Sequence, residues 1–100
     1  MKSRRSDSVA CLLRLYVAAG SPSSHRAISN LRAFCAKHFP DSAKIEIVDV
    51  VKEPQRALKE GVFVTPTLIR VQPQPQRIVI GDLRDEATLA AALGNEELTH

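Results

Sequence analysis

Two apolar segments on either side of an amphipathic one constrain the fold of this chain more than any other feature. The first, residues 9–18, is a near-continuous apolar run broken by Arg14, and the second covers residues 43–51. The first run is typical of a strand buried on both faces of a sheet, and the second also indicates a strand. Between them, apolar residues repeat at helical spacing: Ala27, Ile28, Leu31, Phe34, Cys35 and Phe39. This order predicts a βαβ unit with parallel strands and a right-handed crossover.

Capping residues mark where the predicted helices begin and end. Ser21 is a suitable N-cap, and Pro22 suits the first helical position, where its missing N–H costs nothing. Pro40 ends that helix. Residues 53–60 suit a short helix, and Gly61 can adopt the left-handed conformation that closes it.

The second half of the chain predicts a hairpin and a last helix. Residues 67–71 and 77–80 indicate strands, and the link between them, Gln-Pro-Gln-Pro-Gln, is too short for a crossover. Asp85 can cap a helix that ends at residues 94–95, and its alanines favour a helix there. The order β-α-β-α-β-β-α describes an α/β domain with a four-stranded mixed sheet and three helices. This is the thioredoxin-like topology.

Length and charge limit the classes of function. One hundred residues suffice for one domain, which we place at residues 9–95 between flexible tails at 1–8 and 96–100. No apolar run is long enough to span a membrane, and the basic N-terminus lacks the apolar region of a secretory signal, so we expect a cytoplasmic protein. A net charge of +3, with no aromatic platform, argues against nucleic acid as a partner.

The thioredoxin topology raises the question of thiol chemistry. A thioredoxin needs a reactive cysteine at the start of its first helix, where the helix N-terminus lowers the thiol pKa. Residues 20–24, Gly-Ser-Pro-Ser-Ser, contain no sulfur, and Cys35 lies about three turns further along. Cys35 and His38 alone do not make a metal site. We therefore expect no catalysis, no metal and no cofactor.

Four sequence blocks, in order, resemble the KaiB family. They are similar to that family's LYVAG, VIDVLKNPQ, ATPTL and PPPVRRIIGDL stretches: residues 15–27 (LYVAAGSPSSHRA), 47–55 (IVDVVKEPQ), 64–68 (VTPTL) and 73–83 (PQPQRIVIGDL). The resemblance implies a protein-binding module, without thiol redox activity, for a KaiC-type ATPase in a clock or a stress or timing response. The N-terminal domain of SasA-type histidine kinases is a cousin, so such a kinase is a possible competitor or partner.

The same resemblance implies a second fold and a set of site residues. Members of the family switch between a ground state that forms tetramers and a thioredoxin-like state that binds partners, so a homodimer or tetramer is also implied. Thr65, Pro66, Pro73 and Pro75 are the candidate switch residues, and Pro66 is the expected cis-proline of the thioredoxin-like state.

Three arginines are the candidate partner-binding residues. Arg26, Arg70 and Arg77 fall where the family has basic contact residues. The alternative is an ordinary solvated face. Two other functions also stay open, a protein related to thioredoxin-fold oxidoreductases and a purely structural oligomer.

Overall fold

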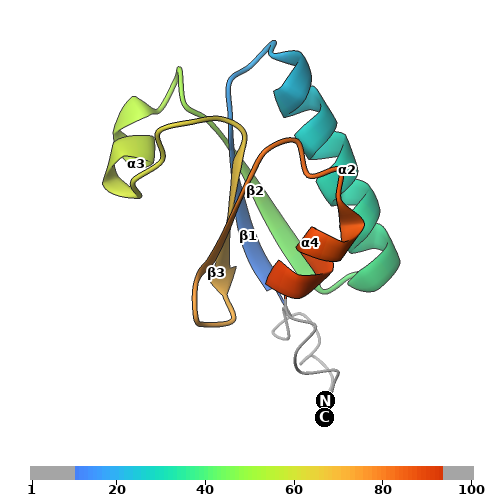
Figure 1. Ribbon diagram of the computed structural model, residues 1–100. Helices are drawn as coiled ribbons and strands as arrows, with labels where there is room; N and C mark the ends of the chain where they lie inside the picture. Colours follow the sequence, from blue (N-terminus) through green and yellow to red (C-terminus); the bar gives the residue numbers. More distant parts are fainter. Residues whose placement is uncertain (1–10, 94–100) are drawn as a thin grey trace.

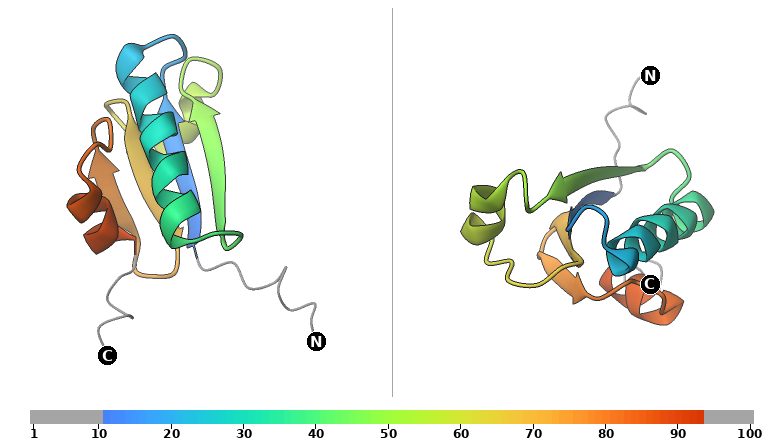
Figure 2. Two further views of the ribbon diagram at one scale, coloured as in Figure 1. Left: turned by 90° about the vertical axis from the view of Figure 1, so that its right-hand side faces the viewer. Right: turned by 90° about the horizontal axis from the view of Figure 1, so that it is seen from above.

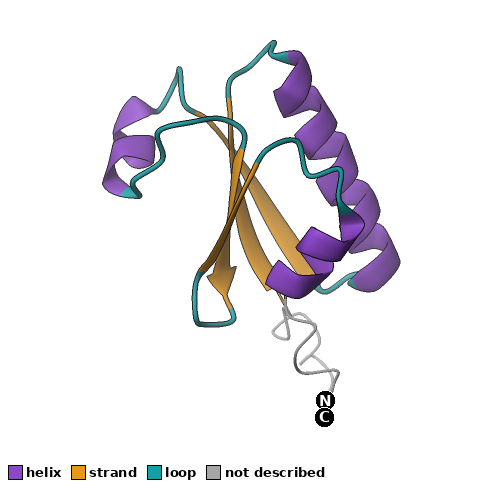
Figure 3. Ribbon diagram, viewed as in Figure 1, coloured by secondary structure: helices purple, strands orange, loops and turns teal. Residues whose placement is uncertain are grey.

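Strands and helices follow one another in the predicted order in the computed structural model, which describes residues 11–93 of the chain (Figures 1 and 3). The proposed tails at 1–8 and 96–100 lie outside the described residues. The elements are β1 (Cys11–Val17), α2 (Pro22–His38), β2 (Ala43–Asp49), α3 (Pro54–Lys59), β3 (Thr67–Gln72), β4 (Arg77–Ile80) and α4 (Glu86–Ala92). The α/β class is confirmed.

The four strands form one mixed sheet in the order β2-β1-β3-β4. β1 and β2 are parallel, with Cys11 opposite Ala43 and Val17 opposite Asp49. β3 runs antiparallel to both β1 and β4. The βαβ unit and the hairpin are both confirmed, and β2 and β4 are the two edges of the sheet.

Helices cover the two faces of the sheet unequally. α2 and α4 lie on one face, and the short α3 lies on the other (Figures 1 and 2). Alternate residues of β1 point to opposite faces. The larger core, on the α2 side, contains Cys11, Leu13, Leu15, Val17, Ala27, Leu31, Phe34, Cys35, Leu68, Leu83, Leu89 and Leu93. The smaller core, on the α3 side, contains Tyr16, Val48, Ala57, Val62 and Ile69.

The predicted caps form as expected. The Ser21 side chain accepts a hydrogen bond from the backbone N–H of Ser24, at 3.2 Å, and Pro22 begins α2. The Asp85 carboxylate accepts from the backbone N–H of Ala87, at 3.1 Å, and begins α4. These hydrogen bonds satisfy backbone donors that have no partner within the helix.

Candidate protein-interaction surface

The turn before α2, where a thioredoxin carries its cysteines, is held together by serine hydroxyls. Ser21 and Ser23 are linked through their Oγ atoms at 3.1 Å, and Ser24 Oγ accepts from the backbone N–H of Ala18 at 3.0 Å. The Ser24 side chain is buried. These hydroxyls complete the turn and the cap, and the hydrogen bonds that they make within residues 11–93 go to one another and to backbone N–H groups.

Both cysteines are buried thiols in the larger core. Cys11 lies in β1 with its Sγ 3.4 Å from the backbone oxygen of Leu93. Burial, and secondarily the nearby Cys11, raises the pKa of the Cys35 thiol to about 11. Because the thiolate is the nucleophile in disulfide exchange, a protonated Cys35 thiol at neutral pH is unreactive.

Thiol labelling tests this arrangement. In the native protein, Ellman's reagent should react with Cys11 and Cys35 about a hundredfold more slowly than with an unfolded chain, since both thiols are buried and Cys35 is protonated. Denaturant should restore fast reaction of both. An added cysteine at the exposed position Ser29 (S29C), as a control, should react quickly in the native state. Rapid native labelling of the wild type would contradict the buried arrangement.

The segment before β3 contains a cis peptide bond and lies at the same end of the sheet as the turn before α2. Thr65–Pro66 is cis, as are Gln72–Pro73 and Gln74–Pro75 in the hairpin. The Pro66 carbonyl accepts from the backbone N–H of Gly81 at 3.0 Å, which joins this segment to the end of β4. The part of Thr65, Pro66, Pro73 and Pro75 in switching stays a prediction.

An apolar patch on the α3 side of the sheet is open to solvent. We define it by four side chains from the segment before β3 and from β4, with their exposed fractions: Phe63 (82%), Val64 (49%), Ile78 (55%) and Ile80 (66%). They line a groove of about 270 Å³ together with Thr67, Ile69 and Glu60. Large apolar side chains grouped in this way mark interaction sites.

Sequence reasoning missed this apolar patch. Ile78 and Ile80 occupy alternate positions of β4 and therefore share a face, which is a signal in the sequence. What the sequence does not give is the position of α3, which packs against Tyr16, Val48 and Ile69 and leaves β4 uncovered.

The three candidate arginines do not form one basic surface. Arg26 on α2 is exposed and pairs with Asp82, Nε to Oδ2 at 3.1 Å. Arg77 is exposed on β4 and lies opposite Arg70 in the hairpin register. Arg70 is buried, with 2% of its surface exposed, and its Nη2 donates to the Pro75 carbonyl at 2.7 Å. The side chain of Arg70 is therefore not exposed in this fold, because it lies on the α2 side of β3, opposite Leu13 of the larger core. The part of Arg26, Arg70 and Arg77 in partner binding stays a prediction.

A network of charged groups fastens α3 to the sheet. Arg14 on β1 pairs with Glu46 and Glu60, both at 2.9 Å, and Arg56 pairs with Glu46 at 2.8 Å. The Tyr16 hydroxyl donates to Glu60 at 2.7 Å. Hydrogen bonds from Arg14 and Arg56 lower the pKa of Glu46. The ionised Glu46 carboxylate therefore contributes to the stability of the fold above the ordinary carboxyl pKa. This contribution is lost as the pH falls through the lowered pKa of Glu46.

Tyr16 reports on this network because it is the one tyrosine of the chain and tryptophan is absent. Burial, and then its hydrogen bond to Glu60, raises the pKa of Tyr16 to about 12. Since the folded pKa lies above the unfolded value of about 10, ionisation of Tyr16 lowers stability as the pH rises between these values. We expect the phenolate absorbance to titrate with a midpoint near the folded value.

A variant separates burial from the hydrogen bond to Glu60 as causes of the raised pKa of Tyr16. Glu60→Gln removes the charge of the acceptor, so the midpoint of Tyr16 should move down towards, without reaching, the value in denaturant. A wild-type midpoint equal to that in denaturant would show that Tyr16 is solvated and that α3 does not cover it.

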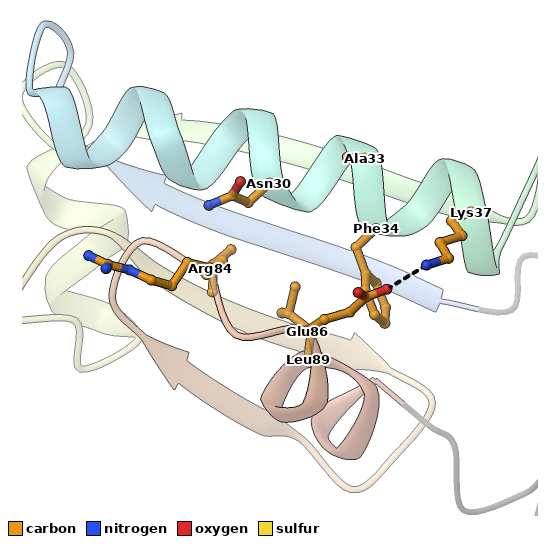
Figure 4. Close-up of a pocket in the computed structure, with 8 residues that line it drawn as sticks. Asn30, Ala33, Phe34, Lys37, Arg84, Glu86 and Leu89 are labelled. Carbon is orange, nitrogen blue, oxygen red and sulfur yellow. Dashed lines mark hydrogen bonds and ion pairs between the residues drawn. The ribbon is translucent and has the colours of Figure 1, made fainter.

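A second groove, of about 280 Å³, lies between α2 and the segment leading into α4 (Figure 4). Its rim carries charges of both signs, and Lys37 Nζ pairs with Glu86 Oε2 at 3.2 Å across it. Phe34 and Leu89 form its apolar floor. Within residues 11–93, no group of three or more histidine, cysteine or carboxylate side chains could hold a metal ion. None of the helices described is long and apolar enough to cross a membrane.

Fold and site together define a thioredoxin-like domain with no cysteine at its active-site turn and with an exposed apolar patch. Comparison with known proteins agrees with this class. The model of the KaiB domain matches residues 14–94. The chain belongs to the KaiB family.

Similar sequences include circadian clock proteins of Synechocystis and Prochlorococcus. The chain is 43% identical over 72 residues to the circadian clock protein KaiB3 of Synechocystis, which covers 72% of this chain and 71% of that protein. It is 38% identical over 82 residues to the circadian clock oscillator protein KaiB of Prochlorococcus marinus strain MIT 9312, covering 82% of this chain and 78% of that one. The resemblance found in the sequence blocks is thereby confirmed.

Solved structures support the fold. The N-terminal domain of Synechococcus elongatus SasA has a TM-score of 0.74 at 21% identity, covering 90% of this chain and 85% of that chain. Fasciola hepatica thioredoxin has a TM-score of 0.68 at 18% identity, covering 92% and 86%. The thioredoxin-like topology predicted from the order of elements is confirmed.

Proposed function

We propose that this chain is a protein-binding module of the cytoplasm that engages a KaiC-type ATPase in a clock or a stress or timing response and catalyses no thiol exchange. One observation carries the proposal: the turn that would hold reactive thiols is built from hydroxyls, while the apolar patch is left exposed on the same domain. Membership of the KaiB family supports the choice of partner.

The binding surface that we propose consists of the apolar patch and a positively charged side chain at the edge of the sheet. Phe63 is the most exposed large apolar side chain of the patch, and aromatic side chains in such positions are frequent binding hot spots. Arg77, at the start of β4, lies at the edge of the sheet next to Ile78, and its side chain leaves the strand on the α2 face, opposite to the patch. A partner with an apolar centre and an acidic rim would match it. A SasA-type kinase, whose N-terminal domain shares the fold, is the proposed competitor for the ATPase.

A binding measurement with a purified KaiC-type ATPase from the same cells tests the proposal. Phe63→Ser should weaken binding at least about tenfold, and Arg77→Glu should weaken it further at low salt. The matched control for Phe63→Ser is Val51→Ser, which removes an apolar side chain of similar exposure (73%) outside the patch and should leave binding unchanged. Absence of binding by the wild type would overturn the choice of partner.

An insulin-reduction assay tests the proposal that this chain catalyses no thiol exchange. We expect no turnover, because Cys35 is buried and its pKa is raised to about 11. Measurable turnover by the wild type that is lost in Cys35→Ser would revive the oxidoreductase alternative.

A further inference from the structure

The α3 side of the sheet carries less helix than the other side. α2 and α4 cover one face with 17 and 7 residues, whereas α3 has 6 residues. α3 packs on Tyr16, Val48 and Ile69, near one end of the sheet, and no other described helix lies over that face (Figures 1 and 2). Because helices usually form a layer on each face of an α/β sheet, the part of this face formed by β3 and β4 has room for another helix.

The strand register places two exposed isoleucines on this open part of the sheet. Ile78 of β4 lies opposite Ile69 of β3, which is buried in the smaller core on the α3 side. Ile80 lies opposite Thr67, two residues along, and so shares that face. An antiparallel hairpin with one face in water normally has polar side chains on that face. Isoleucines that are 55% and 66% exposed there are instead typical of an interaction face.

The apolar patch extends beyond the edge strand. Phe63 and Val64 come from the segment before β3, and Ile78 and Ile80 come from β4, yet all four line one groove. A strand added beside β4 would contact the two isoleucines and leave Phe63 and Val64 uncovered. A helix is about 10 Å wide and, lying in the groove, would contact all four side chains. To match β3, whose 6 residues span about 20 Å, it would need about 13 residues.

One charged group adds a requirement to the partner. Among the described residues that line the groove, Glu60 alone is charged. Its Oε1 accepts hydrogen bonds from Arg14 Nη1 at 2.9 Å and from the Tyr16 hydroxyl at 2.7 Å. Neither bond uses Oε2, which can therefore accept from a side chain of the partner. A lysine or arginine beside an apolar stripe would complement this acceptor.

We infer that this groove takes an amphipathic helix of a partner protein, with apolar residues at i, i+3, i+4 and i+7 and a basic residue over Glu60. The exposed parts of the four patch side chains amount to roughly 400 Å², a usual size for a functional patch. Since an isolated peptide loses conformational entropy when it folds on the patch, we expect a dissociation constant of about 100 µM for the helix alone. The inference rests on the proposed function only in assigning the patch to protein binding.

A synthetic peptide of about 14 residues tests this inference, with four leucines at helical spacing and a lysine at each end of the stripe. Titrated into the full chain, it should shift the methyl NMR resonances of Val64, Ile78 and Ile80 and become helical by circular dichroism. A peptide of the same composition with leucines at alternate positions, the pattern of a strand, should bind at least about tenfold more weakly. If it binds equally well or more tightly, the partner segment is not a helix and the inference is wrong.

Variants of the chain locate the binding. Ile80→Ser should weaken binding of the helical peptide at least about tenfold. The matched control Val51→Ser changes an apolar side chain that is 73% exposed outside the patch, and should leave binding unchanged. Replacing the peptide lysines with glutamates should weaken binding about threefold at low salt, and Glu60→Gln should remove most of that difference. Circular dichroism checks that each variant is folded.

The outcomes separate this inference from the choice of ATPase. If the ATPase binds but the helical peptide does not, the inference fails and the proposed function stands. If the peptide binds as expected but the ATPase does not, the inference stands and the choice of ATPase fails. Shifts of the patch resonances when the chain alone is concentrated would mean that a second copy occupies the patch, which would also overturn the inference.

Discussion

Replacing Leu31 with alanine is expected to lower the free energy of unfolding by about 3–4 kcal/mol. Leu31 is fully buried in the larger core, where it fixes α2 on the sheet. The cost combines the lost burial of the side chain with the cavity left behind, which rigid neighbouring strands cannot fill. Since small domains are stable by only about 5–15 kcal/mol, this is a large part of the total.

Urea unfolding followed by circular dichroism measures the effect. The matched control is Arg32→Ala, which shortens the next side chain of the same helix, an exposed one, and should change the free energy of unfolding by less than about 0.5 kcal/mol. A cost below about 1 kcal/mol for Leu31→Ala would mean that α2 is not packed on the sheet as described.

Arg70→Met is expected to raise the free energy of unfolding, by about 1–2 kcal/mol. The Arg70 guanidinium is buried, its Nε has no hydrogen-bond partner, and no carboxylate among the described residues pairs with it. Removing a poorly compensated buried charge while keeping a long apolar side chain favours the folded state. The Pro75 carbonyl, which loses the bond from Nη2, belongs to an exposed residue and can bind water instead.

Two further variants test this explanation for the gain from Arg70→Met. Arg77→Met makes the same change at the exposed residue opposite in the hairpin and should have little effect. Arg70→Ala removes the charge but leaves a cavity, so it should raise the free energy of unfolding less than Arg70→Met does, or lower it. Destabilisation by Arg70→Met would show that the guanidinium is well compensated, and our account of its burial would then be wrong.

Much of the fold could be predicted because several local signals agree. The apolar runs of β1 and β2, on either side of an amphipathic helix with Ser21 and Pro22 at its start, allow one simple arrangement, a parallel βαβ unit. The short link between β3 and β4 allows only a hairpin. The absence of sulfur in the turn before α2 was equally visible in the sequence.

The candidate site was harder to predict because it depends on which surfaces remain uncovered. Arg70 lies two residues after the buried Leu68 in β3 and so shares its face, but a charged side chain at that position was interpreted as exposed. That Phe63 and Ile80 form one exposed patch could not be predicted, because the sequence does not say how far α3 extends across the sheet. Burial of a charge and exposure of apolar groups are set by tertiary packing, which local patterns do not encode.

Because the two faces of the sheet are covered unequally, they also differ in how readily the structure opens locally. α3 has six residues, too few to be stable alone, and one of them, Ala57, is buried. Lifting α3 away therefore costs far less than unfolding β1, which is hydrogen-bonded to a strand on either side. Amide protons of α3 should exchange with solvent long before those of β1, and each such opening briefly uncovers the side chains of Tyr16 and Ile69.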